Sequence, residues 1–148
     1  MGRLIAVCAS EKRQEPKVPL QEAVVRFDGG IAGDSHGDHP SRPLSLLRLE
    51  DVADVERRAG FPVPPGSLAE NLVVEGLDAA QLIPGARLRL GEEVLLEVVE
   101  KGKRPEEPHS YDYRGICLLP THGFFLRPLQ GGSIRPGDAV AVEEDSLI

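Results

Sequence analysis

The stretch that decides the fold class runs from Ala86 to Val99 and reads Ala-Arg-Leu-Arg-Leu-Gly-Glu-Glu-Val-Leu-Leu-Glu-Val-Val. Over residues 86–90 apolar and charged residues alternate, which is the period of a strand with one buried and one solvated face. Gly91-Glu92-Glu93 supplies turn chemistry, and residues 94–99 are the most apolar strand of the chain. The stretch therefore predicts two antiparallel strands joined by a tight turn.

Similar short runs lie on both sides of this hairpin and are separated by turns rich in glycine and proline. The strands expected at 4–9 and 21–27 should pair with each other, because β-branched Val24 and Val25 favour a pleated surface. Turns are expected at Gly131-Gly132 and at residues 136–138. Many short strands with one clear helix predict a mainly β protein built as a closed or nearly closed barrel. The further strands are expected at 4–9, 21–27, 44–49, 123–129 and 139–143.

Residues 50–60 form the clearest helical segment. Acidic residues occupy its first turn and arginines its last, so both ends complement the helix dipole, and Gly60 stands where a C-cap glycine belongs. A single further helical turn is expected after Asp78, which can cap it, and should end near Leu82.

Composition excludes several functional classes. The chain has 148 residues, which suits one domain spanning 1–148. Its net charge of -7 and its aromatic content of 4% oppose a nucleic-acid partner, since phosphates are bound by clustered cations and bases by aromatic rings. The apolar start at residues 4–7 is too short for a signal peptide or a membrane span, so we expect a cytoplasmic protein with no membrane partner.

Cys8 and Cys117 are the only cysteines. In a reducing compartment two widely separated cysteines are expected to be thiols rather than a disulfide. Cys8 lies in an apolar strand and is interpreted as a small buried hydrophobic residue. For Cys117 the same interpretation competes with a chemical role.

Four segments together resemble the MOSC domain, the module found at the C-terminus of molybdenum-cofactor sulfurases. Each alone is weak, but their order and spacing, with the intervening strand that follows Pro84-Gly85, make the resemblance specific. It covers nearly the whole chain. The four segments are Gly30-Ile31-Ala32-Gly33-Asp34-Ser35-His36, Arg42-Pro43-Leu44-Ser45-Leu46-Leu47, Pro65-Gly66-Ser67-Leu68-Ala69-Glu70-Asn71-Leu72 and Gly131-Gly132-Ser133-Ile134-Arg135-Pro136-Gly137-Asp138.

The resemblance implies a MOSC-type barrel, similar to the pyruvate-kinase barrel, with one or two short helices. It also implies a sulfur-carrier or molybdenum-cofactor role centred on a late cysteine, here Cys117. Two departures from the family pattern stand out. Some relatives carry an earlier cysteine after a Gly-Lys pair, where this chain has Pro105 two residues after Lys103, so a disulfide mechanism at the site is in doubt. Ala69 replaces a glycine that the family usually has before Glu-Asn-Leu.

Cations flank Cys117 along the sequence, and a thiolate needs such neighbours to stay ionised. Lys101, Lys103, Arg104, Arg114 and Arg127 would stabilise a thiolate, a persulfide or the anionic groups of a pterin cofactor if they face one cleft. With the resemblance, the set of residues predicted to bind a cofactor is Gly33, Asp34, His36, Arg42, Asn71, Lys103 and Arg127.

Structural interpretations compete for four of these residues. Gly33-Asp34 is expected to form a tight turn at the rim of the site. His36 is as readily part of a solvated loop. Arg42 is equally suited to bridge Asp34, and the amide of Asn71 to cap the turn after Pro65-Gly66.

Acidic and histidine side chains also gather in this loop, but their spacing fits no standard ligand pattern, so no metal site is predicted. The group consists of Asp34, His36, Asp38 and His39, together with His109 and His122.

Three functions remain open. In the leading hypothesis, a pyridoxal-phosphate-dependent cysteine desulfurase loads sulfur onto Cys117, which holds it as a persulfide for delivery to a metal–sulfur or molybdenum centre. In the second, Cys117 ligates molybdenum in a reductase component for N-hydroxylated compounds, although such reductases generally carry an additional β-barrel extension. In the third, the protein is a non-catalytic barrel that binds an anionic small molecule.

Overall fold

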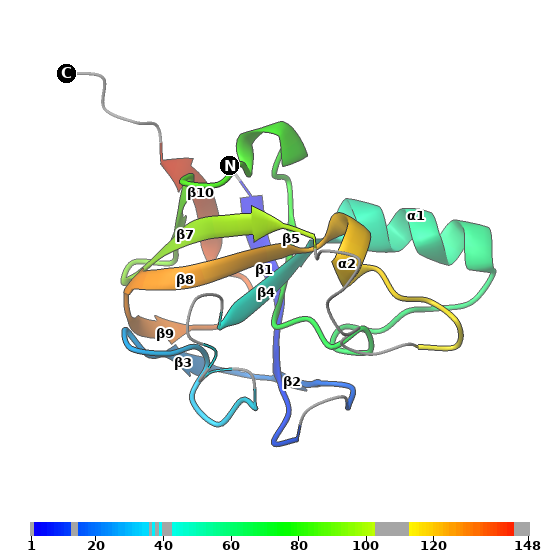
Figure 1. Cartoon of the computed structure of the whole chain (residues 1–148), viewed down its shortest axis with the longest axis horizontal. Coiled ribbons are helices and arrows are strands. Elements are labelled where there is room, and N and C mark those ends of the chain that lie inside the picture. The colour runs from blue at the N-terminus through cyan, green and yellow to red at the C-terminus, as the bar shows by residue number, and fades with distance from the viewer. Residues whose placement is uncertain are drawn as a thin grey trace.

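A computed structural model describes residues 2–12, 15–35, 37, 39, 43–102 and 113–143 and shows a mainly β protein with two short helices (Figure 1). Seven strands form a barrel that closes where the last strand pairs antiparallel with the first, with Gly2 opposite Val140. The predicted MOSC-type barrel is thereby confirmed. Around the ring the strands are β1 (Gly2–Ala9), β5 (Leu72–Glu75), β4 (Leu44–Arg48), β8 (Phe124–Gln130), β7 (Val94–Lys101), β6 (Arg87–Leu90) and β10 (Ala139–Glu143).

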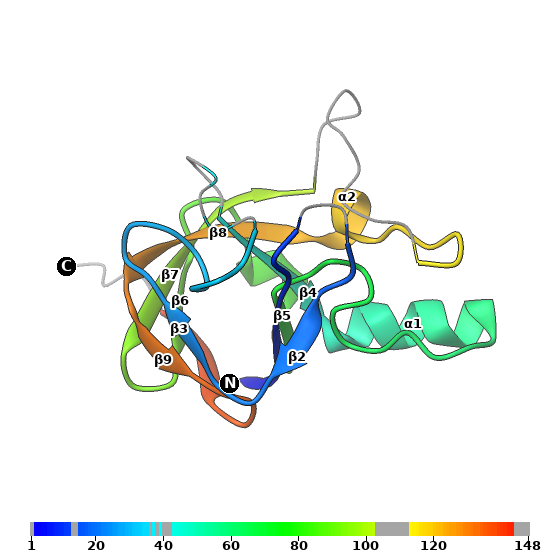
Figure 2. The ribbon, with the colours of Figure 1, turned by 90° about the horizontal axis from the view of Figure 1, so that it is seen from below.

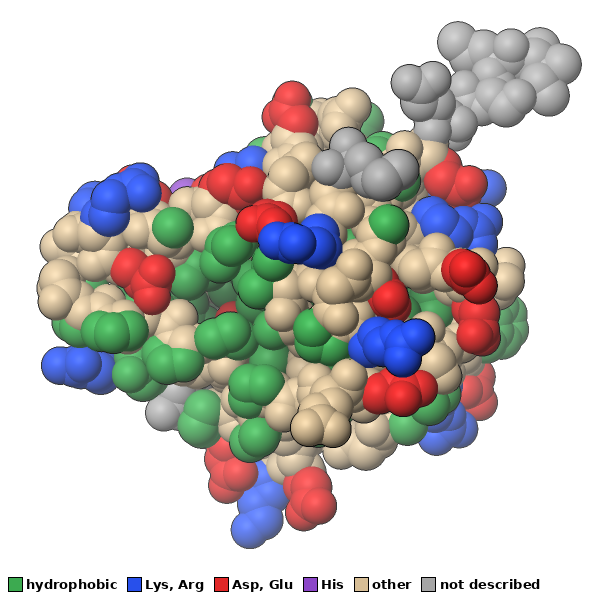
Figure 3. Space-filling view, turned by 180° about the vertical axis from the view of Figure 1, so that it is seen from behind, with side chains coloured by type: hydrophobic (Ala, Val, Ile, Leu, Met, Phe, Trp, Pro, Cys, Tyr) green, Lys and Arg blue, Asp and Glu red, His purple; other side chains and the backbone are tan. Residues whose placement is uncertain are grey.

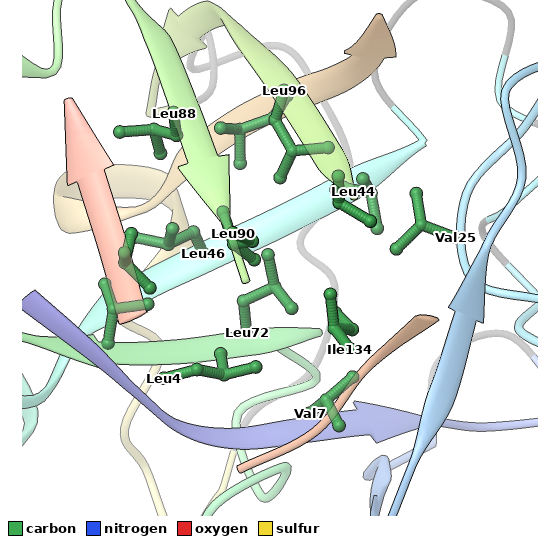
Figure 4. Close-up of a cluster of buried hydrophobic side chains, with 14 of the residues drawn as sticks. Leu4, Val7, Val25, Leu44, Leu46, Leu72, Leu88, Leu90, Leu96 and Ile134 are labelled. Atoms are coloured by element: carbon green, nitrogen blue, oxygen red, sulfur yellow. The ribbon is translucent and has the colours of Figure 1, made fainter. Parts of the chain in front are cut away.

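The hairpin predicted from residues 86–99 is present as β6 and β7, paired antiparallel with Leu88 opposite Leu96. The apolar side chains of the alternating β6 strand point into the barrel, where Leu88 and Leu90 are fully buried. They pack with leucines and valines from the other strands (Figure 4). Burying one such side chain contributes roughly 1.5–3 kcal/mol, so this interior is the main source of stability.

The strand predicted at 21–27 is present only in part, as a shorter strand, and it does not pair with β1 as expected. The chain instead forms β2 (Val18–Leu20), which pairs with β1, and β3 (Ala23–Val25), which pairs with β9 (Gly132–Ile134) (Figure 2). The proline in β2 is tolerated because β2 is an edge strand.

The predicted turn at Gly131-Gly132 is also partly wrong, since Gly132 begins β9. A Cβ at Gly131 would lie 2.6 Å from the carbonyl oxygen of Val25. Glycine therefore lets the backbone from β8 into β9 run close against β3.

The predicted helix is α1 (Leu49–Ala59), and Gly60 follows it with φ 81°, as a left-handed C-cap glycine does. The expected short turn is the 3-10 helix η1 (Ala79–Gln81), and the side chain of Asp78 accepts a hydrogen bond from the N–H of Ala80. The second helix, α2 (Leu119–His122), comes directly before β8. Within the described residues, no helix is both long enough and apolar enough to cross a membrane.

Two smaller apolar clusters lie outside the barrel interior. In the first, α1, α2 and the segments next to them pack over Phe125 of β8; its buried members are Leu47, Val52, Val63, Leu68, Leu118, Leu119 and Phe125. In the second, Ile5 and Leu49 pack on the outward side chains of β1 and β5. Seen from behind, hydrophobic side chains gather in a shallow hollow on one half of the molecule, and basic and acidic side chains intermingle on the other (Figure 3).

Candidate functional site

Cys117 follows a tight two-residue turn. Tyr113 and Ile116 exchange backbone hydrogen bonds of 2.9 Å in both directions, which closes the turn over Arg114 and Gly115. Both central residues have positive φ, 53° and 87°, the pattern of a type I′ hairpin turn. Cys117 is the next residue, and it is partly exposed. The thiol thus directly follows a short, internally bonded hairpin turn.

The residues that follow Cys117 anchor it from the other side. Leu118 and Leu119 are buried in the cluster over Phe125, and Leu118 is the N-cap of α2. The carbonyl oxygen of Leu118 accepts hydrogen bonds from the N–H groups of Thr121 and His122. Cys117 therefore stands at the edge of an apolar platform, between a fixed hairpin and a fixed helical turn.

Aromatic contacts tie the hairpin to the segment after α1. The guanidinium carbon of Arg114 lies 3.9 Å from the centre of the Phe61 ring. The ring of Tyr113 meets the same ring edge-on, with centroids 6.3 Å apart. In Figures 1 and 2 the yellow segment that carries Cys117 accordingly runs out from α2 alongside α1, toward the helix's C-terminal end.

A buried network of polar side chains surrounds Asp34. Lys17 Nζ donates to Asp34 Oδ1 over 2.6 Å, and both side chains are almost entirely shielded from solvent, at 6% and 0% exposed. The N–H of Ser10 donates to the same carboxylate oxygen. Breaking a buried ion pair is costly, because the remaining charge is desolvated and unpaired. The pair therefore holds Lys17 and Asp34 firmly in place.

Asn71 extends this network into the barrel wall. It is fully buried, and its Nδ2 donates to Asp34 Oδ2 at 3.1 Å and to the carbonyl oxygen of Cys8 at 3.0 Å. Its Oδ1 accepts from the N–H of Ser45. The amide therefore ties β1, β4 and the Asp34 turn together. A ligand would have to displace these bonds to reach its side chain.

Glu70 is a second buried acid beside the network, 1% exposed. Its carboxylate accepts from the N–H of Leu68 at 3.2 Å. Burial raises the pKa of this carboxyl to about 7. Nearby backbone N–H groups, including that of Gly66, and the charge of Lys17 lower the pKa, but by less than burial raises it. Glu70 is therefore about half protonated near neutral pH.

Cys8 is the buried thiol that the sequence predicts. It is 0% exposed, and burial together with the nearby carboxylates of Glu70 and Asp34 raises its pKa to about 12, with Lys17 opposing. Such a thiol does not ionise at neutral pH and is inert. Both cysteines lie in the described part of the chain, and they are not joined in a disulfide.

The family model of the MOSC domain matches residues 33–141, which span most of the chain. The chain belongs to the MOSC domain family. This family is associated with the molybdenum cofactor.

Solved MOSC structures share the fold. The chain is 20% identical to YiiM from Geobacillus stearothermophilus, with a TM-score of 0.70 over 99% of this chain and 77% of the other. It is 17% identical to the YUAD protein from Bacillus subtilis, with a TM-score of 0.72 over 95% and 94%. YiiM from Escherichia coli is 19% identical, with a TM-score of 0.62 over 96% and 70%. Among curated proteins no sequence match was found.

The structure separates the residues predicted from the MOSC resemblance into groups. Asp34 and Asn71 are in direct contact, and Gly33, with φ 85°, forms the expected tight turn, in which the N–H of Asp34 donates to Ile31. Cys117 belongs to the segment that packs with α2. The cofactor role of these residues stays a prediction.

Three of the cations predicted around Cys117 lie in the described part of the chain, and each contacts a different side chain. Arg127 lies on the outer face of β8 and pairs with Glu97 of β7 at 2.7 Å. Lys101 ends β7, with its Nζ 5.7 Å from the centre of the Phe124 ring. Arg114 stacks on Phe61. Four further predicted residues, His36, Arg42, Lys103 and Arg104, lie outside the described residues.

Three residues of the site were not predicted from the sequence: Lys17, Glu70 and Phe61. Lys17 sits in a polar connection, where nothing local signals burial. Glu70 offered a signal, because it is a lone acid between the apolar residues Leu68 and Leu72 in a segment that the MOSC resemblance had already marked. Within the described residues, no three side chains of His, Cys, Asp or Glu cluster as a metal site would require.

Proposed function

We propose that the protein is a sulfur carrier in which Cys117 holds a persulfide and delivers it to a metal–sulfur or molybdenum centre. The observation that supports this most is the contrast between the two thiols. Cys117 is partly exposed at the edge of a rigid platform, whereas Cys8 is buried and its pKa is raised to about 12. Only the former can meet an outside molecule.

The transfer needs no external oxidant. The Cys117 thiolate attacks the terminal sulfur of a persulfide on a donor protein, such as a cysteine desulfurase. The new S–S bond forms on Cys117, and the donor leaves as its thiolate. An acceptor then attacks the terminal sulfur, and Cys117 is released as a thiolate again. The half-exposed position suits this exchange, because the sulfur must be reached by two partners in turn.

The chain's residues also fit the molybdenum cofactor at one point. Molybdenum takes thiolate ligands, and a partly exposed Cys117 is of that type. Bound there, the cofactor would supply two-electron redox chemistry, as the reductase alternative requires. The chain would contribute the thiolate of Cys117 and the platform that orients it, while Asp34 and Asn71, turned inward, keep the barrel wall in place.

Intact-mass spectrometry tests the proposal. After incubation with a cysteine desulfurase and cysteine, the protein should gain the mass of a sulfur atom that a reductant removes. Cys117→Ser should lose this gain, and Cys8→Ala is the matched control that should keep it. Absence of the added sulfur in wild type, or its retention in Cys117→Ser, would refute the carrier role. Stoichiometric molybdenum without added sulfur would favour the reductase alternative.

A further inference from the structure

The turn before Cys117 holds an unfavourable residue at a demanding position. Arg114 has φ +53°, a left-handed conformation in which an L side chain crowds its own backbone. At the first central position of a type I′ turn, asparagine and glycine are strongly preferred, and Asn-Gly is the strongest hairpin signal. Here the dipeptide is Arg-Gly. The backbone alone therefore gives no reason for an arginine at this position.

The side chain of Arg114 supplies the compensation. Its guanidinium lies 3.9 Å over the Phe61 ring, well within the range of a cation–π contact. Asparagine, which would suit the turn better, is too short and carries no charge to make this contact.

Phe61 is itself held firmly. It comes directly after Gly60, the C-cap of α1, and before Pro62, which fixes the backbone. The N–H of Val63 donates to Glu56 Oε2 at 2.7 Å, which ties the segment back to the helix. The ring that receives Arg114 is therefore part of a rigid frame formed by α1 and its exit.

We propose that Arg114 and Phe61 form a latch that positions Cys117 by fastening the hairpin to the end of α1. Arg114 is a positioning residue, because it acts on the sulfur through the hairpin. The reciprocal hydrogen bonds between Tyr113 and Ile116 make the hairpin move as a unit, so holding Arg114 holds the residue after Ile116. The inference rests on the proposed function only in taking Cys117 as the reacting residue.

Release of the latch leaves the hairpin with fewer contacts, those of Tyr113 and Ile116, while the buried Leu118 and Leu119 still anchor Cys117 on the other side. The hairpin then samples open positions, and the thiol becomes more accessible to small reagents while losing its fixed orientation toward a protein partner. A purely architectural contact would lower overall stability without changing how the native protein exposes this thiol.

The test measures native-state alkylation of Cys117 by iodoacetamide, followed at the Cys117 peptide by mass spectrometry over a range of pH. Arg114→Asn is the decisive variant, because it suits the turn and removes the guanidinium, so the fold is retained. We expect it to raise the plateau rate at high pH by a factor of about 2 to 30, the range that one cation–π contact supports. Phe61→Leu, which also removes the ring contact of Tyr113, should raise it at least as much, and adding Arg114→Asn to Phe61→Leu should change nothing further. Arg57→Asn, an exposed arginine of α1, is the matched control.

Three results would overturn the latch. Arg114→Asn alkylated at or below the wild-type rate would mean that the residue serves only the turn. A shift in the pH midpoint with an unchanged plateau would mean that Arg114 acts through its charge. If the rate in the double variant rose by the product of the two single increases, the two side chains would act independently. Since no sulfur is transferred in this assay, failure of the latch and failure of the carrier role are observed separately.

Discussion

The buried carboxyl of Glu70 makes the stability of the fold depend on pH in a direction opposite to that of most acids. Its pKa rises from an ordinary value of 4.5 to about 7 on folding. Between these two values the folded protein keeps the proton and the unfolded chain has lost it, so the free energy of unfolding falls as the pH rises. At about 1.4 kcal/mol per pKa unit, the loss amounts to roughly 3 kcal/mol between about pH 4.5 and about pH 7.

The perturbation that isolates this effect is Glu70→Gln. Glutamine keeps an oxygen that can accept from the N–H of Leu68 but has no proton to lose. Between about pH 5 and about pH 8, urea unfolding should show that the free energy of unfolding of wild type falls by roughly 3 kcal/mol relative to the variant. This corresponds to a shift of about 1 to 3 M in the urea concentration at the midpoint. Glu75→Gln, a partly exposed acid at the end of β5, controls for general charge effects. A difference between wild type and Glu70→Gln that stays constant or grows with pH would refute the reasoning.

Three further expectations can be checked with the same purified protein. Asp34→Ala should destabilise the fold by roughly 3–5 kcal/mol in chemical denaturation, because Lys17 is left buried without its carboxylate. Adding Lys17→Met to this variant should recover most of the loss. A loss below about 1 kcal/mol for Asp34→Ala would contradict the buried pair. A thiol reagent should modify Cys117 in the native protein and Cys8 only after unfolding, as counted by mass, and early modification of Cys8 would contradict its burial. Gly66→Ala should lower the midpoint of thermal unfolding by more than a typical surface change does, because its Cβ would stand 2.1 Å from the carbonyl oxygen of Lys17; an unchanged midpoint would show that the loop adjusts freely.

Much of the barrel could be predicted because its signals are local. Alternation in residues 86–90, the glycine after α1 and the cap at Asp78 each act within a few residues, and each element is present. The strand predicted at 21–27 was only partly right, because β3 pairs with β9, far along the chain, while β1 pairs with β2, which lies before the predicted strand. Local propensity does not contain that information.

The candidate site was less predictable for the same reason. The sequence marked Cys117, Asp34 and Asn71, but not that the last two would bind each other inside the wall. Lys17 became the partner of Asp34 through a pairing across the fold that no spacing suggests. The contact of Arg114 with Phe61 likewise joins two segments that only the packing of α1 brings together.

Because the barrel closes by pairing β1 with β10, it cannot close until the last of its strands has been made. The strand at Gly2–Ala9 is made before the other strands of the barrel, yet part of its edge stays open until Ala139–Glu143 arrives. Contacts so far apart along the chain are slow to form, because a long loop must be closed before any stabilisation is gained. During synthesis the apolar interior lined by the early strands therefore stays unsealed until the last strand of the barrel is made.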